Sequence, residues 1–289
     1  MWFHLAILPA AGAWPRGAYG LALRGVESRA ALLSAITPPV EEVQLRLVRG
    51  APRPTEFEIA QATARWPLPD GGRVELDRRA GTATITSPAE PEIDSLIHPQ
   101  LGMLAAVWSR WLGRPAFHAA GFAHAGGAWA VVGDNQDGKS TLIAALAARG
   151  VAVVADDTLV IADGRCVSGP RCVDLRGETA ARLGLAGATI TLVRGGTRQR
   201  LLLPVAGPPA LLRGWIYLRW ADDVALRPIS PRDRVARVAL QRRGHRGGAR
   251  DSGSLLELGT LPAWELCRPR DWGRIDETLD AVLGTLETA

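Results

Sequence analysis

The stretch GDNQDGKST, residues 133–141, decides the fold class of this chain of 289 residues. It matches the pattern Gly-x-x-x-x-Gly-Lys-Ser/Thr, whose glycine-rich loop directs backbone N–H groups at phosphate groups. Residues 128–132 (AWAVV) predict a short buried strand before the loop, and residues 141–149 (TLIAALAAR) predict a helix that stops at Gly150. Strand, loop and helix in this order are the context that the motif requires, so the sequence predicts a phosphate-binding loop in an α/β fold.

The residues of this loop are candidate ligands of a nucleotide, and each type suits its place. Lys139 is the single lysine among 34 basic residues, and a compact ammonium suits the β- and γ-phosphates better than a guanidinium does. The hydroxyl of Ser140 suits a Mg²⁺ ion. We expect Asp137 to point to solvent, because its charge would otherwise repel phosphate. The predicted cofactors are therefore ATP and Mg²⁺, and the predicted nucleotide-binding residues are Gly133, Asp134, Asn135, Gln136, Asp137, Gly138, Lys139, Ser140 and Thr141.

A second candidate element is the stretch VAVVADDTLVI, residues 151–161, a β-branched strand interrupted by Asp156 and Asp157. The helix after the loop leads about 15 Å away from it at 1.5 Å per residue, and the strand returns about 16 Å at 3.3 Å per residue. The two carboxylates should therefore lie level with the phosphate loop. Beside a magnesium nucleotide, one acid can help to hold the metal and the other can take a proton from an incoming hydroxyl. The alternative is a solvated turn, like the one expected at residues 222–223.

His118, the loop and the two acids together resemble the catalytic domain of HPr kinase/phosphorylase. The spacing carries the resemblance: His118 stands fifteen residues before Gly133, and Asp156 stands fifteen residues after Thr141. The resemblance implies that His118 lies at the active site, that Asp156 assists the metal and that Asp157 is the base. It also implies a P-loop kinase domain of the HPr kinase/phosphoenolpyruvate carboxykinase type. The chain departs from that family at Thr141, where the family has glutamate, and it has no counterpart of the family's phosphorolysis loop after Asp157.

The rest of the chain resembles the HPr-kinase-related proteins that are encoded beside lasso-peptide and other peptide-maturation genes. The similarity covers residues 95–289, and the stretches that carry it are residues 167–184, 212–219, 225–238 and 262–283. In that group, kinases phosphorylate the C-terminal serine of a precursor peptide. The resemblance therefore implies a peptide substrate of this kind.

Residues 1–90 carry no chemical motif and predict a smaller N-terminal domain, α+β or mostly β, in front of the kinase domain at residues 91–289. The apolar start of the chain has no basic residue before it, and we interpret it as a strand and not as a signal peptide. Residues 93–112 predict one helix with an apolar face, and residues 117–122 and 128–132 predict a hairpin. Apolar runs between Gly- and Pro-rich turns predict short strands at residues 5–8, 43–48, 73–77 and 82–86.

Composition and charge exclude several classes of protein. Hydrophobic residues make up 47% of the chain and charged residues 22%, which is the balance of a globular protein and not of a disordered one. The three cysteines have neither even pairing nor zinc-binding spacing, which indicates a reduced, cytoplasmic compartment. We expect no membrane partner, because every long apolar stretch is interrupted by polar residues or glycines. We expect no nucleic-acid partner, because no aromatic residues are interleaved with the arginines.

Together these features predict a serine kinase that uses Mg-ATP on a ribosomally made precursor peptide or small protein. The predicted catalytic residues are Lys139, His118 and Asp157, and the predicted metal-side residues are Ser140 and Asp156. The Arg/Gly-rich residues 241–253 would clamp an acidic peptide or a nucleotide, or form a solvated connector. The alternatives are a kinase of an HPr-like carrier protein or of a small molecule, and a nucleotide-dependent regulatory protein without transfer activity. Assembly into a homo-oligomer is left open.

Overall fold

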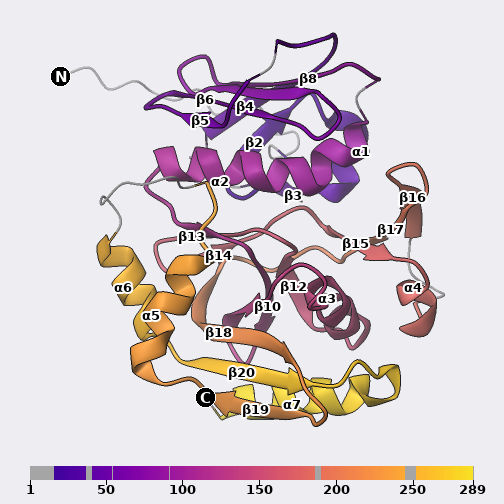
Figure 1. The fold of residues 1–289 in the computed structure, drawn as a ribbon, viewed down its shortest axis with the longest axis vertical. Helices are drawn as coiled ribbons and strands as arrows, with labels where there is room; N and C mark the ends of the chain where they lie inside the picture. The colour runs from indigo at the N-terminus through magenta and orange to yellow at the C-terminus, as the bar shows by residue number, and fades with distance from the viewer. Residues whose placement is uncertain are drawn as a thin grey trace.

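The computed structural model describes residues 16–36, 41–53, 55–90, 92–185, 190–244 and 252–288. Within these residues the chain is a mixed α/β structure with sheets of eight, nine and three strands (Figure 1). No helix in this part of the chain is long and apolar enough to cross a membrane. The strand expected at residues 5–8 lies outside the described residues.

The first sheet is built from residues 16–87 and has the strand order β3-β1-β2-β4-β8-β7-β6-β5. Three of the predicted strands are confirmed, since residues 43–48 lie within β4, residues 73–77 form β7 and residues 82–86 lie within β8. Alternate residues of β7 and β8 are buried, as expected for strands that pack one face on a core. The strands are β1 (Arg16–Ala18), β2 (Leu21–Arg24), β3 (Ser34–Ala35), β4 (Glu41–Arg49), β5 (Glu58–Ile59), β6 (Thr63–Pro67), β7 (Arg73–Asp77) and β8 (Thr82–Ser87), and the short helix η1 (Glu27–Leu32) connects β2 to β3.

The single helix expected at residues 93–112 is wrong, because the chain breaks it at His98. The structure has α1 (Ile93–Ser95), the irregular turn η2 (Leu96–Gln100) and then α2 (Leu101–Trp111). His98 has the extended dihedrals φ −151° and ψ 122°. Pro99 explains the break, since a proline disfavours helical dihedrals in the residue before it. The break places His98 against the cavity described below.

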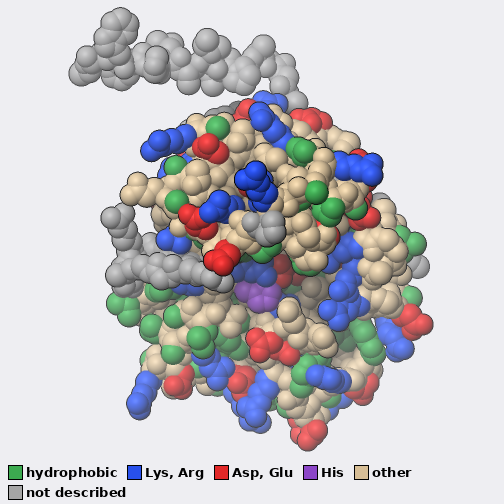
Figure 2. Space-filling model, turned by 45° about the horizontal axis from the view of Figure 1, so that its top comes forward, with side chains coloured by type: hydrophobic (Ala, Val, Ile, Leu, Met, Phe, Trp, Pro, Cys, Tyr) green, Lys and Arg blue, Asp and Glu red, His purple; other side chains and the backbone are tan. Residues whose placement is uncertain are grey.

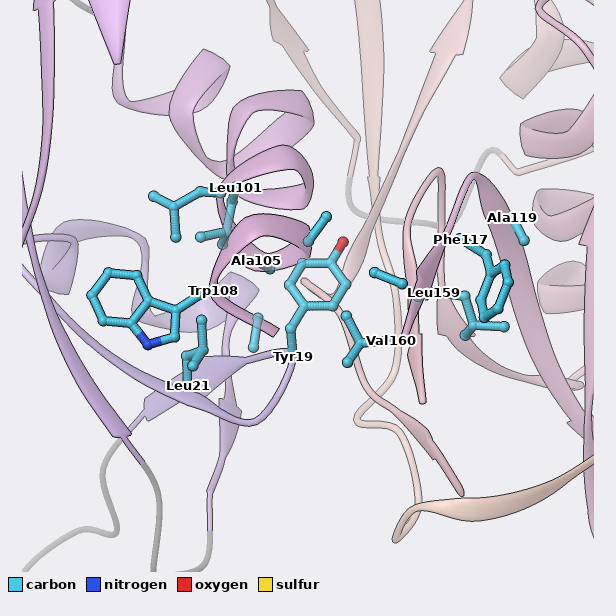
Figure 3. Close-up of a cluster of buried hydrophobic side chains, with 14 of the residues drawn as sticks. Tyr19, Leu21, Leu101, Ala105, Trp108, Phe117, Ala119, Leu159 and Val160 are labelled. Carbon is cyan, nitrogen blue, oxygen red and sulfur yellow. The ribbon is translucent and has the colours of Figure 1, made fainter. Parts of the chain in front are cut away.

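Helix α2 lies between the first sheet and the central sheet (Figure 1). Its buried face includes Leu101, Leu104 and Trp108. Tyr19, from the turn after β1, lies between α2 and Val160 of the central sheet (Figure 3), so that one hydrophobic core joins the two layers. The division into an N-terminal domain and a kinase domain at residue 90 stays a prediction.

The central sheet has the order β12-β10-β11-β18-β14-β13-β9, with β20 beside β18 and β19 beside β20. The predicted hairpin is confirmed: β10 pairs with β11 from Ala119 opposite Val132 to His124 opposite Gly127. Strand β11 runs parallel to β18, and β18 runs parallel to β20. The strands are β9 (Ala116–Phe117), β10 (Ala119–His124), β11 (Gly127–Val132), β12 (Ala152–Ala155), β13 (Leu159–Ala162), β14 (Arg165–Val167), β18 (Ala210–Trp220), β19 (Ala225–Pro228) and β20 (Ala263–Arg268).

The remaining elements surround this sheet. Helix α3 (Lys139–Ala148) packs against β10 and β12, and α7 (Ile275–Glu287) packs against α3 and β10. The three-stranded sheet β15-β17-β16, with the short helix α4 (Thr179–Arg182), contacts α3 through β15. Helices α5 (Pro231–Leu240) and α6 (Ser252–Thr260) pack on each other. The small sheet comprises β15 (Cys172–Arg176), β16 (Ile190–Val193) and β17 (Arg198–Leu202), and η4 (Trp272–Arg274) precedes α7.

Candidate active site

The glycine-rich loop connects β11 to α3, as the sequence predicts. Gly138 is the last residue of the loop and has φ +81°, a left-handed conformation that glycine adopts without strain. The expectation that Asp137 points to solvent holds in part, because the residue is only half-buried and its Oδ2 accepts an exposed hydrogen bond of 2.6 Å from the backbone N–H of Asp134. The carboxylate thus also braces the loop by satisfying one of its N–H groups.

Lys139 lies at the start of α3 and is buried, with 7% of its surface exposed. Its Nζ donates to the carbonyl oxygens of Gly133 at 2.5 Å and of Asp134 at 3.1 Å, and it lies 3.3 Å from Nε2 of His118. Burial lowers the pKa of Lys139, while Asp157 and Asp156 oppose that shift. The single lysine of the chain is therefore held across the mouth of the loop, on the side where the two acids lie.

Asp156 follows β12 and reaches the first turn of α3. Its two carboxylate oxygens each accept a hydrogen bond of 3.1 Å from the Ser140 hydroxyl. Asp156 is almost fully buried, and burial together with the negative charge of Asp157 raises its pKa to about 7. The Asp156 carboxylate therefore has too little positive charge around it to balance its own. It accepts from the Ser140 hydroxyl, which the loop motif assigns to a metal ion.

Asp157 has φ +65°, a left-handed conformation that is uncommon for a residue with a side chain. Arg243 grips its carboxylate with two hydrogen bonds, Nη1 to Oδ2 at 2.8 Å and Nη2 to Oδ1 at 3.1 Å, and Nη1 also donates to Thr158 Oγ1. Burial raises the pKa of Asp157, but Arg243, with His98 and His118, shifts it below its ordinary value. Asp157 is therefore an anion at neutral pH, held in a fixed orientation.

His118 lies between β9 and β10, and not inside a strand of the hairpin. Its Nδ1 lies 2.5 Å from Nη2 of Arg243 and 3.3 Å from Oδ1 of Asp157, while its Nε2 faces Lys139. Burial lowers the pKa of His118, and the cations Arg243 and Lys139 lower it further. The imidazole is therefore neutral at physiological pH and connects the predicted base to the predicted phosphate clamp.

Lys139, Ser140 and Asp157 line one cavity of about 400 Å³ beside the loop. Asp156 and His118 are not part of its lining and contact it through Ser140 and Lys139. A hollow with histidine and basic side chains is visible on this face of the molecule (Figure 2). The cavity brings together predicted residues from the loop, the start of α3 and Asp157. On its opposite wall lie residues that the sequence analysis did not assign to the site: His98, Asp174, Arg176, Arg194 and Arg198.

Two of these unassigned arginines have no ion pair among the described residues. Arg176 and Arg198 face each other across β15 and β17, whereas Arg194 pairs with Asp174 at 3.1 Å. Burial and the charges of Arg176 and Arg194 lower the pKa of Arg198. This wall therefore repels cations and favours an anion. Pro99 was the only sequence signal that could have placed His98 here, by marking the helix break.

The donor set fits a magnesium nucleotide. A hydroxyl from Ser140 and a carboxylate from Asp156 are the hard oxygen ligands that Mg²⁺ prefers, and phosphate oxygens usually complete its shell. Within the described part of the chain, no group of three or more His, Cys, Asp and Glu side chains could hold a metal without such a ligand.

Comparison with known proteins gives little further guidance. No family model matches the sequence, and no curated protein matches it. Among solved structures that are similar is the Hpr(Ser) kinase/phosphatase from Coxiella burnetii, with 13% sequence identity and a TM-score of 0.32 over 60% of this chain and 97% of that chain. At this level of similarity, the likeness does not establish a shared activity.

Proposed function

We propose that the chain is a Mg-ATP-dependent kinase that transfers the γ-phosphate of ATP to a serine hydroxyl. One observation carries the proposal: the phosphate loop with Lys139, the hydroxyl of Ser140, which is hydrogen-bonded to Asp156, and the fixed, ionised carboxylate of Asp157 meet at one cavity. The first group holds phosphates, the second holds a divalent cation, and the third accepts a proton. Phosphoryl transfer needs these three capacities at one place.

The chemistry follows from the positions of the side chains. Lys139 and the N–H groups of the loop hold the β- and γ-phosphates. Ser140 and Asp156 would hold Mg²⁺, which when bound neutralises charge on the phosphate oxygens. Asp157 takes the proton from the acceptor hydroxyl, whose oxygen forms the new bond to the γ-phosphorus as the bond to the bridging oxygen of ADP breaks. Arg243 is the positioning residue for this base, because it fixes both carboxylate oxygens.

For the acceptor, we propose a ribosomally made precursor peptide that presents a serine at its C-terminal end. The anion-favouring wall of the cavity supports it, because Arg176 and Arg198 have no acidic partner in the described residues and suit a terminal carboxylate. A flexible chain end can enter a cavity that a folded surface cannot. The predicted clamp at residues 241–253 is seen only in part: Arg243 belongs to the site, and residues 245–251 lie outside the described residues.

One observation favours the second candidate, a nucleotide-dependent regulatory protein without transfer activity. Arg243 occupies both oxygens of Asp157, and a carboxylate so engaged is a weaker base than a free one. In a regulatory protein, Arg243 would keep Asp157 from acting as a base. The two candidates therefore predict opposite effects of Arg243→Gln: slower phosphoryl transfer if the chain is a kinase, and faster transfer if Arg243 holds the base inactive.

The proposal is tested by incubating the full chain with Mg-ATP labelled at the γ-phosphate and a short peptide that ends in serine. We expect label on that serine, and much less label on the same peptide with a C-terminal amide. A peptide that ends in alanine is the negative control. Nucleotide binding without label on peptides, small proteins or small hydroxyl compounds would contradict the kinase and favour the regulatory protein.

A further inference from the structure

A second cavity, of about 260 Å³, lies next to the phosphate loop. Gln136, Gly138 and Thr141 line both this cavity and the larger one, so the two spaces meet at the end of the loop and the first turn of α3. The second cavity is otherwise built from the ends of β18 and β20 and from the segment that leads into α7. A ligand whose phosphates lie on the loop can therefore extend into it.

Arg268 forms the floor of this cavity and has an unusual environment. It is 4% exposed and takes part in no ion pair with any described residue. One Nη2–H donates to the carbonyl oxygen of Asp137 in the loop, and the guanidinium lies 4.4 Å from the ring centre of Trp220. Its Nε is buried without a hydrogen-bond partner, and burial lowers the pKa of Arg268 to about 10. The charge of Asp137 offsets this shift only in part. A buried donor without a partner is a costly arrangement that an acceptor atom of a bound ligand would relieve.

Trp220, the last residue of β18, adds a second unsatisfied donor. Its indole Nε1 is buried and has no partner. An indole N–H and a guanidinium N–H can only donate, so a ligand that satisfies both must bring acceptor atoms. Two buried donors without partners, on neighbouring residues that line one cavity beside a phosphate loop, are the feature that the phosphate-binding motif does not explain.

The remaining walls offer flat surfaces. Trp272 is 36% exposed, and Arg182 lies 5.8 Å from its ring centre. Arg270 lies 4.9 Å from the ring centre of Trp220, and Pro269, Asp271 and Ile275 complete the lining. Indole rings and guanidinium planes are the groups on which nucleic-acid bases stack. The cavity thus combines stacking surfaces with hydrogen-bond donors.

We infer that this cavity binds the nucleoside of the phosphate donor, with the base against Trp272 and Arg270 and with acceptor atoms of the base or ribose on Arg268 Nε and Trp220 Nε1. The inference rests on the proposed function, because it takes the loop to hold the triphosphate. It adds which side chains recognise the nucleoside of that donor, since a chain of phosphates alone would leave both donors unsatisfied.

The test compares the affinities of the full chain for Mg-ATP and for magnesium tripolyphosphate, measured by titration calorimetry. We expect the wild-type chain to prefer ATP by about tenfold or more, as for one stacked base. Trp272→Ala should remove most of that preference, and Trp220→Phe, which keeps an aromatic ring and removes the N–H, should reduce it about two- to tenfold. Neither variant should change the affinity for tripolyphosphate. The matched control is Trp111→Phe. It removes a remote indole N–H that donates to the carbonyl of Ala60, and it should change the affinity for neither ligand.

Equal affinities of the wild-type chain for the two ligands would overturn the subsite. The subsite would also be overturned if Trp272→Ala and Trp220→Phe weakened the affinities for ATP and tripolyphosphate equally, because the two tryptophans would then act through the loop. The failure of the proposed function looks different: a preserved preference for ATP without transfer to any hydroxyl leaves the subsite standing and refutes the kinase. Transfer from ATP with equal binding of tripolyphosphate refutes the subsite alone.

Discussion

Two glycines at opposite ends of α3 allow a controlled test of how closely Arg268 must approach the phosphate loop. Gly138 precedes the helix with φ +81°, and Gly150 follows it with φ +79°. A Cβ at Gly150 would meet nothing within 4 Å, whereas a Cβ at Gly138 would lie 2.7 Å from Nη2 of Arg268. The two Gly→Ala variants therefore share the backbone strain and differ in one contact.

The expected magnitudes follow from this comparison. Each alanine costs ~1–2 kcal/mol for its left-handed backbone, and ~1 kcal/mol shifts the midpoint of thermal unfolding by about 2–4 °C for a chain somewhat shorter than this one. Gly138→Ala should cost more than Gly150→Ala, because it pulls Arg268 away from the carbonyl of Asp137 and loses one charge-assisted contact of ~1.5–3 kcal/mol. The displaced guanidinium should also lose its hydrogen bond to the nucleoside, and a loss of the same size there weakens ATP binding about ten- to a hundredfold.

The assay is thermal unfolding of both variants together with titration of Mg-ATP. We expect a lower midpoint for Gly138→Ala than for Gly150→Ala, wild-type affinity for Gly150→Ala and weakened affinity for Gly138→Ala. If Gly138→Ala binds ATP as tightly as Gly150→Ala, the close approach of Arg268 to the loop has no part in nucleotide binding, and the reasoning is refuted.

Three further predictions concern single side chains. Lys139→Met and Lys139→Arg should each slow transfer on the order of 10²-fold or more, because neither replaces a compact charge on the phosphates; a Lys139→Arg enzyme with wild-type turnover would contradict the assignment. Arg243→Gln should lower kcat about tenfold or more without changing the Kd for Mg-ATP, since it loses a charged hydrogen bond to the base of ~1.5–3 kcal/mol; a rise in kcat would show instead that the arginine restrains the site. Arg29 donates two hydrogen bonds to Asp94 and lowers its pKa in the folded chain. Asp94 should therefore stabilise the fold at any pH above the pKa of the unfolded side chain. That contribution should be lost as the pH falls through the lower pKa of the folded state. Thermal unfolding of Asp94→Asn should therefore show ~1–3 kcal/mol of destabilisation at pH 7 and a narrowing difference from wild type below about pH 4; a constant difference would contradict this ion pair.

Local patterns in the sequence were sufficient to predict the centre of the site. The strand–loop–helix unit is a contiguous stretch, and its helix and return strand have lengths that bring Asp156 level with Ser140, where the structure places it. Strands β7 and β8 could also be predicted, because each buries one face and its buried residues therefore alternate with less buried ones.

The rest of the site depends on contacts between distant parts of the chain. Arg243 stands 86 residues after Asp157, and Arg268 reaches the loop only because β20 runs parallel to β18. No period or motif in the sequence records such pairings. His98 was missed for another reason: the apolar face at residues 93–112 favoured an unbroken helix, and the backbone preference imposed by Pro99 prevailed.

The most direct test of the central claim, that Asp157 is the base of a phosphoryl transfer, is a parallel measurement of Mg-ATP binding and transfer in Asp157→Asn. An amide keeps the shape of the carboxylate but cannot take the proton of the acceptor hydroxyl. We expect a Kd for Mg-ATP close to that of the wild type, with transfer slowed on the order of 10²-fold or more. The companion variant Asp156→Asn should weaken the magnesium-dependent part of ATP binding as well. Wild-type transfer by Asp157→Asn, or loss of its ATP binding in place of transfer, would contradict the claim.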